Sequence, residues 1–365
     1  MLPLLPDDVI AEILSWVPVK QACRFRCVSQ RWRALISSQA FLAAHKTRTE
    51  PLLMCVTSSY SWPQVSSALR LMDVDGNVLK AIDMPGQWVF NYGFDGPLGF
   101  TTAFCVPDYK FIINMIDPAT GNVMKTPKEL NIRPYWNLGV GLAIPSRTYK
   151  AVGLLSEYAQ QHCNVLTVQD GAKWRLVQSV PTPPLDTTGR NKTPPVTVNG
   201  VMHFLYKFVD EDYVFRFDLE SEEWKTWIQG PTRSSADKVE NKTKGMVKLD
   251  DALCIVQWSP LNTWLVWLLT DPAKGTWVKA YTVPVDLTFD LLTPLSVMCD
   301  GRKLLFYACN EPMTMPALHV YDPLTRTCTH LAKFPSNLVG NAGLCNLHLE
   351  CFVSPKISIV SVQSV

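Results

Sequence analysis

Residues 196–224 read VTVNGVMHFLYKFVDEDYVFRFDLESEEW, and this stretch contains the unit that recurs through most of the chain. Residues 196–217 are rich in β-branched and aromatic side chains, which favours a pair of antiparallel strands. Asp218 then ends the apolar run, a polar turn follows, and Trp224 begins a further strand with a side chain that we expect to pack inward. The stretch therefore predicts a run of β-hairpins.

The turn recurs along the chain as an acid followed six residues later by a large or aliphatic residue. The copies are Asp73 with Leu79, Asp117 with Val123, Asp218 with Trp224, Asp271 with Trp277 and Asp322 with Cys328, and a shorter copy runs from Asp170 to Trp174. Asp73 and Asp322 are 249 residues and five steps apart, or about 50 residues a step, the length of a kelch-type propeller blade.

This spacing predicts a propeller of about six blades, a ring that hides the sheet edges. Residues 344–353 have no partner hairpin of their own, so we expect them to form a strand that pairs with the first blade and closes the ring. A β-sandwich is the structural alternative.

The first part of the chain, residues 1–48, has helical rather than strand periodicity. Ile10, Ile13, Leu14 and Val17 are spaced as one apolar stripe of a helix that Pro18 ends. Ser29 is placed to cap a later helix that carries Trp32, Leu35 and Ile36. Fewer than about 50 residues rarely bury enough apolar area to fold alone. Either the strand-rich part, residues 49–365, or a separate polypeptide must therefore cover the stripe.

Four segments of this region, residues 5–8 (LPDD), 12–20 (EILSWVPVK), 24–36 (RFRCVSQRWRALI) and Phe41, together resemble an F-box. The resemblance implies docking on a Skp-family adaptor, which in turn binds a cullin. It implies that the docking surface or its direct support comprises Leu5, Pro6, Ile10, Ile13, Leu14, Val17, Pro18, Val28, Trp32 and Leu35. The alternative for Trp32 is that it is an ordinary core tryptophan. One side chain can both pack in the core and contact the adaptor.

The strand-rich part resembles the F-box-associated, kelch-like domain that is common in plant F-box proteins. The predicted fold class is therefore α+β and multidomain, with a small all-α F-box followed by an all-β propeller. Aromatic and arginine side chains in the predicted connections are candidates for contacting a protein substrate. These are Tyr60, Trp62, Trp88, Tyr92, Arg133, Tyr135, Trp136 and Trp258. The alternative for each tryptophan is to fill the layers between blades.

The composition indicates which kind of partner and which cellular compartment to expect. The chain has 34 Lys and Arg against 32 Asp and Glu, and a net charge of +2 is too small to attract a nucleic acid at long range. The 11 cysteines include no CxxC pair, which favours reduced thiols. The N-terminus has no basic leader, and no apolar run approaches the roughly 20 residues of a membrane span. We therefore expect a protein partner and a location in the cytoplasm, the nucleus or both.

Motifs for catalysis and for metal or cofactor binding are missing from the sequence. His203 and His348 lie in strand-like alternations, where a structural histidine is the usual case, and residues 210–212 (DED) fit a solvated hairpin tip. The sequence thus predicts a non-catalytic substrate receptor of a Skp–cullin–F-box ubiquitin ligase, without a cofactor. The alternative function is a glycan- or metabolite-binding propeller, or a propeller enzyme, with a merely structural helical N-terminus.

Overall fold

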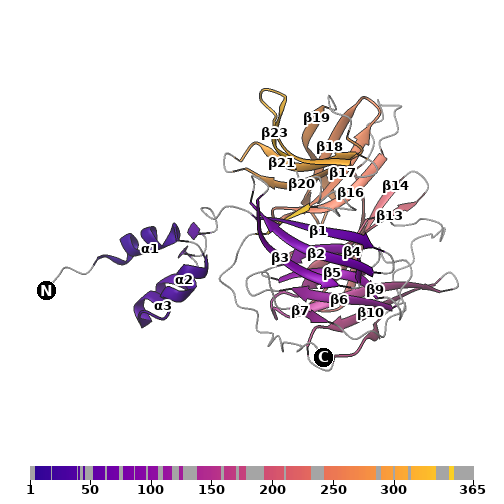
Figure 1. Cartoon of the computed structure of the whole chain (residues 1–365). Coiled ribbons are helices and arrows are strands. Elements are labelled where there is room, and N and C mark those ends of the chain that lie inside the picture. Colours follow the sequence, from indigo (N-terminus) through magenta and orange to yellow (C-terminus); the bar gives the residue numbers. More distant parts are fainter. Residues whose placement is uncertain are drawn as a thin grey trace.

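The computed structural model consists of a group of helices followed by sheets (Figure 1). It describes residues 5–17, 19–38, 40–41, 44–45, 52–61, 64–73, 77–85, 87–95, 98–105, 110–116, 123–125, 138–157, 160–169, 172–177, 193–208, 211–231, 242–284, 289–298, 301–310, 314–333 and 345–348. The helices are α1 (Asp7–Ser15), α2 (Val19–Phe25) and α3 (Gln30–Ile36), and residues 40–41 and 44–45 are helical as well. The predicted domain boundary at 48/49 falls outside the described residues and stays a prediction.

Within the described residues, the strands form six four-stranded antiparallel sheets, which we number in chain order. The first sheet has the order β24 (Cys345–His348), β1 (Leu52–Ser61), β2 (Gln64–Met72), β3 (Val78–Pro85). The second has the order β4 (Gln87–Asp95), β5 (Leu98–Cys105), β6 (Lys110–Ile116), β7 (Val123–Lys125). The third has the order β11 (Arg175–Val177), β10 (Gln160–Thr167), β9 (Tyr149–Glu157), β8 (Leu138–Leu142).

The remaining sheets repeat this up-and-down order. The fourth has the order β12 (Val196–Val198), β13 (Val201–Phe208), β14 (Glu211–Asp218), β15 (Glu223–Gln229). The fifth has the order β16 (Lys242–Leu249), β17 (Ala252–Ser259), β18 (Thr263–Asp271), β19 (Thr276–Pro284). The sixth has the order β20 (Leu291–Val297), β21 (Leu304–Asn310), β22 (Thr314–Asp322), β23 (Thr327–Lys333).

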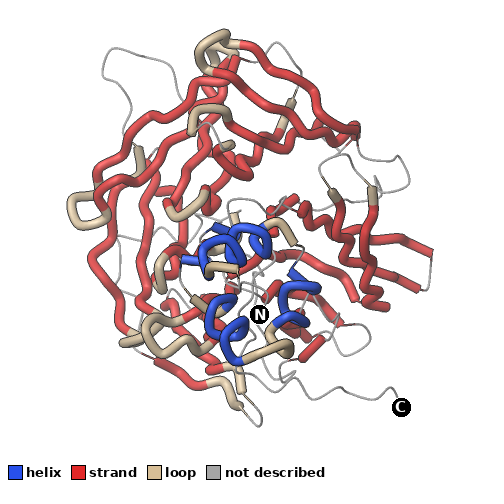
Figure 2. The backbone as a smooth tube through the Cα atoms, turned by 90° about the vertical axis from the view of Figure 1, so that its left-hand side faces the viewer, coloured by secondary structure: helices blue, strands red, loops and turns tan. Residues whose placement is uncertain are grey.

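The sheets follow one another in a closed cycle (Figure 2). One strand at the edge of each sheet contacts the corresponding strand of the next, in the order β4, β8, β12, β16, β20 and β24, and β24 in turn contacts β4. Strand β24 pairs with β1, with Leu52 opposite His348 and Cys55 opposite Cys345. The predicted propeller is therefore confirmed, as is the prediction that a C-terminal strand completes the first sheet.

The apolar core is divided among the interfaces between neighbouring sheets. One cluster joins the third and fourth sheets and contains Leu154, Phe204 and Phe217. Another joins the fifth and sixth sheets around Trp264, which is fully buried. Each sheet packs against two neighbours. The described interfaces therefore remove apolar side chains from water on both faces of a sheet.

The recurring acidic turn joins β2 to β3 in the first sheet, β14 to β15 in the fourth, β18 to β19 in the fifth and β22 to β23 in the sixth. The Oδ1 atoms of Asp73, Asp218, Asp271 and Asp322 accept backbone N–H hydrogen bonds within their own turns at 2.8–3.0 Å. A side-chain carboxylate that accepts backbone N–H bonds stabilises a tight turn. The hairpins predicted around these four acids are therefore confirmed. The turns after Asp117 and at Asp170 lie outside the described residues.

The residue six positions after the acid packs inward in three of these hairpins. Trp224, Trp277 and Cys328 each lie against a core cluster and stand opposite Phe217, Leu269 and Tyr321 of the preceding strand. The same prediction was wrong for Leu79, which is exposed. The register shifts there, so that Met72 pairs with Val78 and Leu71 with Lys80. Leu79 is thus the extra residue of a β-bulge and turns away from the core.

Candidate protein-docking site

The helical region begins with an N-terminal segment that α3 holds in place. The Arg31 Nε atom lies 2.6 Å from the Asp7 carboxylate, and its Nη2 atom donates to the Leu5 carbonyl oxygen at 3.0 Å. The predicted cap at Ser29 is confirmed, because its hydroxyl oxygen accepts from the Trp32 backbone N–H at 3.1 Å. These contacts fix the start of α1 against the start of α3.

The helices bury a small core of their own. Its buried members are Ile10, Leu14, Ile36 and Phe41. Val17, Phe25, Trp32 and Leu35 pack against them, and the rings of Phe25 and Trp32 meet edge to face with centroids 5.7 Å apart. All members of this cluster come from the helical region, so Ile10, Leu14 and Val17 of the stripe predicted on α1 are covered from within it, whereas Ile13 is exposed. The expectation that the sheets or a separate polypeptide must cover the stripe was therefore wrong for these three residues.

Exposed large apolar side chains lie on α1 and next to its two ends. Leu5 precedes the helix, Val9 and Ile13 lie on it, and Trp16 follows it, and we call these four residues the docking face. Ile13 is 54% exposed and Trp16 is 69% exposed, whereas Leu14 in the core is 3% exposed. Residues 9, 13 and 16 have i, i+4, i+7 spacing and therefore share one side of the helix, about 100° round its axis from the buried stripe. Large apolar side chains gathered on an exposed helix face are typical of a protein interface.

The structure separates the predicted adaptor-binding residues into three groups. Leu5, Pro6, Ile13 and Val28 are exposed, and Ile10 and Leu14 are buried. Val17, Trp32 and Leu35 are half-buried and support the core, and Pro18 lies outside the described residues. Sequence reasoning missed Val9 and Trp16, although their spacing from Leu5 and Ile13 would have revealed them. The roles of all these residues remain a prediction.

The predicted substrate-binding residues are spread over several sheets. Tyr60 lies in β1, Trp88 and Tyr92 lie in β4, and Trp258 lies in β17, half-buried against the cluster between the fifth and sixth sheets. The expectation that these four lie in connections was wrong, because each belongs to a paired strand. Trp62, Arg133, Tyr135 and Trp136 lie outside the described residues.

His203 is a buried structural histidine. It is 4% exposed on β13, its Nδ1 atom lies 3.2 Å from the Val196 carbonyl oxygen, and Arg216 lies opposite it on β14. Burial lowers the pKa of His203 to about 4, since a charged imidazole would lose its hydration. The hydrogen bond to the Val196 backbone opposes this effect in part, and the Arg216 charge lowers the pKa further. The side chain is therefore neutral at physiological pH.

This low pKa predicts acid sensitivity of the fold. In the unfolded chain His203 binds a proton below pH 6.5, the ordinary pKa of histidine. In the folded protein it binds that proton only near pH 4. The contribution of His203 to stability is thus complete above pH 6.5 and is lost as the pH falls toward 4. Between pH 7 and pH 5 we expect the free energy of unfolding to fall by roughly 2 kcal/mol on this account. Urea denaturation of the wild type and of His203→Gln at both pH values measures it, and an equal loss in the variant would contradict the assignment.

Two features are absent from the described residues. In that part of the chain, no helix is long and apolar enough to cross a membrane. No group of three or more His, Cys, Asp or Glu side chains is placed to hold a metal ion among the same residues.

Comparison with known protein families identifies both parts of the chain. The F-box domain family matches residues 2–43, and the F-box associated beta propeller domain family matches residues 101–331. An F-box protein of Arabidopsis thaliana is 23% identical over 362 residues, covering 90% of this chain and 76% of the relative. Another relative from the same plant, whose name includes both F-box and kelch repeat, is 24% identical over 310 residues, covering 76% of this chain and 71% of the relative.

Solved structures with a similar course of the chain are more distant. A periplasmic gluconolactonase of Pseudomonas aeruginosa is 12% identical with a TM-score of 0.48, over 81% of this chain and 98% of that one. The β-propeller domain of a trilobed protease from Pyrococcus furiosus is 13% identical with a TM-score of 0.36, over 67% of this chain and 70% of that one.

Proposed function

Because the chain belongs to the F-box proteins that carry an F-box associated β-propeller domain, we propose that it is the substrate-recognition subunit of a Skp–cullin–F-box ubiquitin ligase. The two domains and the F-box relatives support such a role in general. In this proposal the helical region binds a Skp-family adaptor, the adaptor binds a cullin, and the propeller binds the protein to be ubiquitinated.

The observation that carries the proposal is the docking face on α1. Leu5, Val9, Ile13 and Trp16 leave apolar area in water although the helices already have a core. A partner that covers these side chains would gain roughly 25 cal/mol for each Å² of apolar surface buried, with the large Trp16 and Ile13 side chains as its anchors.

In this role the chain contributes proximity rather than a covalent step. A bound substrate is held close to the ubiquitin that another subunit transfers, which raises its effective concentration there.

The free thiols fit a reducing compartment, and we propose that the protein acts in the cytoplasm, the nucleus or both. Cys163 and Cys254 are buried and free, and burial raises the pKa of the Cys163 thiol to about 12, which leaves it protonated and unreactive.

We expect Ile13→Asp to weaken adaptor binding by at least about thirtyfold, the effect of losing one interface anchor. The full chain is co-expressed with a Skp-family adaptor, and the affinity of the purified proteins is measured by calorimetry. Ile13 is preferable to Val17 or Trp32 as a test, because those two side chains support the helical core and their loss would unfold it.

The matched control is Leu324→Asp, which places the same charge on an exposed apolar residue of the sixth sheet's turn. It should bind the adaptor as the wild type does. Undiminished binding by an Ile13→Asp protein with an unchanged urea midpoint would refute the proposed docking mode.

A further inference from the structure

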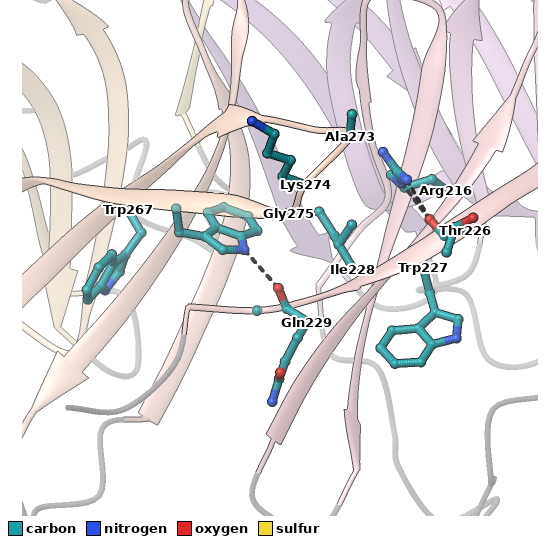
Figure 3. Close-up of a pocket in the computed structure, with 11 residues that line it drawn as sticks. Arg216, Thr226, Trp227, Ile228, Gln229, Trp267, Ala273, Lys274 and Gly275 are labelled. Carbon is teal, nitrogen blue, oxygen red and sulfur yellow. Dashed lines mark hydrogen bonds between the residues drawn. The ribbon is translucent and has the colours of Figure 1, made fainter. Parts of the chain in front are cut away.

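A cavity of about 400 Å³ lies between the fourth and fifth sheets of the propeller (Figure 3). Figure 3 shows its Trp227 and Lys274 side chains pointing away from each other, so one small ligand would not meet both. The Trp277 Nε1 atom donates to the Gln229 carbonyl oxygen at 2.8 Å, and this bond joins the two sheets. The start of α1, in contrast, combines an exposed apolar residue of the docking face with a charged contact to another helix.

The segment that leads into α1 has no side-chain cap. Pro6 is the N-cap residue of α1, and its side chain has no group that could accept a hydrogen bond from the first turn. Leu5 precedes Pro6, is 53% exposed and belongs to the docking face. Helix ends fray, so the position of Leu5 depends on contacts with other elements.

Arg31 of α3 supplies two such contacts. Its Nε atom lies 2.6 Å from the carboxylate of Asp7, the first residue of α1, and its Nη2 atom donates to the Leu5 carbonyl oxygen at 3.0 Å. Among the residues that the structure describes, this is the only hydrogen bond of Leu5. The planar guanidinium suits the task, because it can bind a carboxylate and a carbonyl oxygen at the same time.

These contacts are too exposed to contribute much to the stability of the fold. The Arg31 and Asp7 side chains are 40% and 60% exposed, and ion pairs on the surface are weak. Helix α3 is anchored separately, because Trp32, Leu35 and Ile36 pack in the helical core. Loss of the Arg31 contacts should therefore leave the helices folded and release only the segment before α1.

We propose that Arg31 is a positioning residue for adaptor binding, which holds Leu5 at the end of the docking face before the adaptor arrives. The proposal rests on the proposed function, in which a Skp-family adaptor covers this face. An adaptor that meets a positioned Leu5 loses less conformational entropy than one that must first order the segment. Arg31 is not among the adaptor-binding residues predicted from the sequence.

A double-mutant cycle tests whether Arg31 acts through Leu5. We expect Arg31→Gln to lower the affinity of the full chain for a Skp-family adaptor by about fivefold in calorimetry. Leu5→Ala should lower it by about tenfold. Once Leu5 is replaced, Arg31→Gln should change the affinity by less than about twofold. The same loss on Arg31→Gln with and without Leu5→Ala, or no loss in either, would overturn the proposal.

The matched control is Arg33→Gln, which removes the same charge from α3. Arg33 lies two residues further along the helix and therefore on the opposite side, where its Nε atom donates to the Arg26 carbonyl oxygen at 3.4 Å. Any effect of Arg33→Gln on the affinity should be equal with and without Leu5→Ala. An effect that depends on Leu5 as strongly as that of Arg31→Gln would overturn the positioning role, and urea midpoints confirm that each variant is folded.

Hydrogen exchange tests the same contact in the free chain, without the adaptor. The Ile10 amide donates to the Pro6 carbonyl oxygen at 3.1 Å, so its exchange rate measures opening of the start of α1. We expect Arg31→Gln to raise this rate by about threefold or more and Arg33→Gln to leave it unchanged. An unchanged rate in Arg31→Gln would overturn the proposal.

The two proposals fail separately. If the adaptor ignores both the wild type and Ile13→Asp, or binds them equally, the proposed docking mode is lost, while the exchange rate of Ile10 still shows whether Arg31 holds the start of α1. If Ile13→Asp prevents binding but Arg31→Gln changes neither the affinity nor the exchange rate, the positioning role alone is lost.

Discussion

Gly141→Ala is expected to destabilise the propeller by about 3 kcal/mol. Gly141 lies in β8 of the third sheet, where it faces Thr197 in β12 of the fourth. A Cβ atom at this position would lie 2.7 Å from Thr197 Cγ2 and 2.6 Å from Leu219 Cδ1, and it would collide with Thr197 Oγ1. It would also displace the hydroxyl that donates to the Val140 carbonyl oxygen at 3.4 Å. One methyl group would therefore force the two sheets apart.

Gly245→Ala is the matched control, because it makes the same change in β16 where nothing lies within 4 Å of the added Cβ. Replacing glycine by alanine reduces the freedom of the unfolded chain, so this variant should be unchanged or more stable by up to about 1 kcal/mol. Urea denaturation of both variants measures the difference. Equal midpoints for Gly141→Ala and the wild type would show that the third and fourth sheets are not closely packed at β8 and β12.

The sequence was informative wherever one local pattern determined one local structure. The acidic turns predicted the hairpins, because Asp and the residues after it form a turn without help from distant parts of the chain. The spacing of these turns then predicted the propeller. The bulge at Leu79 could not be read in this way, since the two strands on either side of the turn settle their register only when their side chains pack.

The candidate sites depend still more on tertiary packing. Ile10, Ile13 and Leu14 look alike in a helical periodicity, but only the positions of α3 and Phe41 decide which of them are buried. The hydrogen bond from Arg216 to the Pro272 carbonyl oxygen likewise joins the fourth and fifth sheets across 56 positions of the chain. No spacing within one hairpin encodes such a contact.

A buried ion pair between the third and fourth sheets provides the second large effect. Glu222, in the turn after β14, lies 2.8 Å from the Lys150 Nζ atom of β9, and it also pairs with Arg175 of β11. The Glu222 and Lys150 side chains are largely buried. Burial alone would raise the pKa of the Glu222 carboxyl, but the hydrogen bonds and charges of Arg175 and Lys150 outweigh it and hold the pKa below its ordinary value.

We expect Glu222→Gln to lower the free energy of unfolding by about 3 kcal/mol at pH 7, because it leaves the Lys150 ammonium buried without its counter-charge. Since the pKa of Glu222 is lowered, its contribution is complete above the ordinary value of 4.5 and is lost as the pH falls through the value in the folded protein. The difference between wild type and variant in urea denaturation should therefore shrink in acid. Asp251→Asn, at an exposed carboxylate 3.9 Å from Lys248, should cost less than about 1 kcal/mol.

A double-mutant cycle separates the ion pair from the packing of its members. Lys150→Met removes the charge and keeps an apolar side chain of similar length, so Lys150→Met combined with Glu222→Gln should be more stable than the two single losses predict by at least about 1 kcal/mol. Purely additive losses would mean that Lys150 and Glu222 stabilise the protein independently. Coupling between them would instead show that the ion pair holds the third and fourth sheets together. Each of the two residues would then stabilise the protein only when its partner on the other sheet is present.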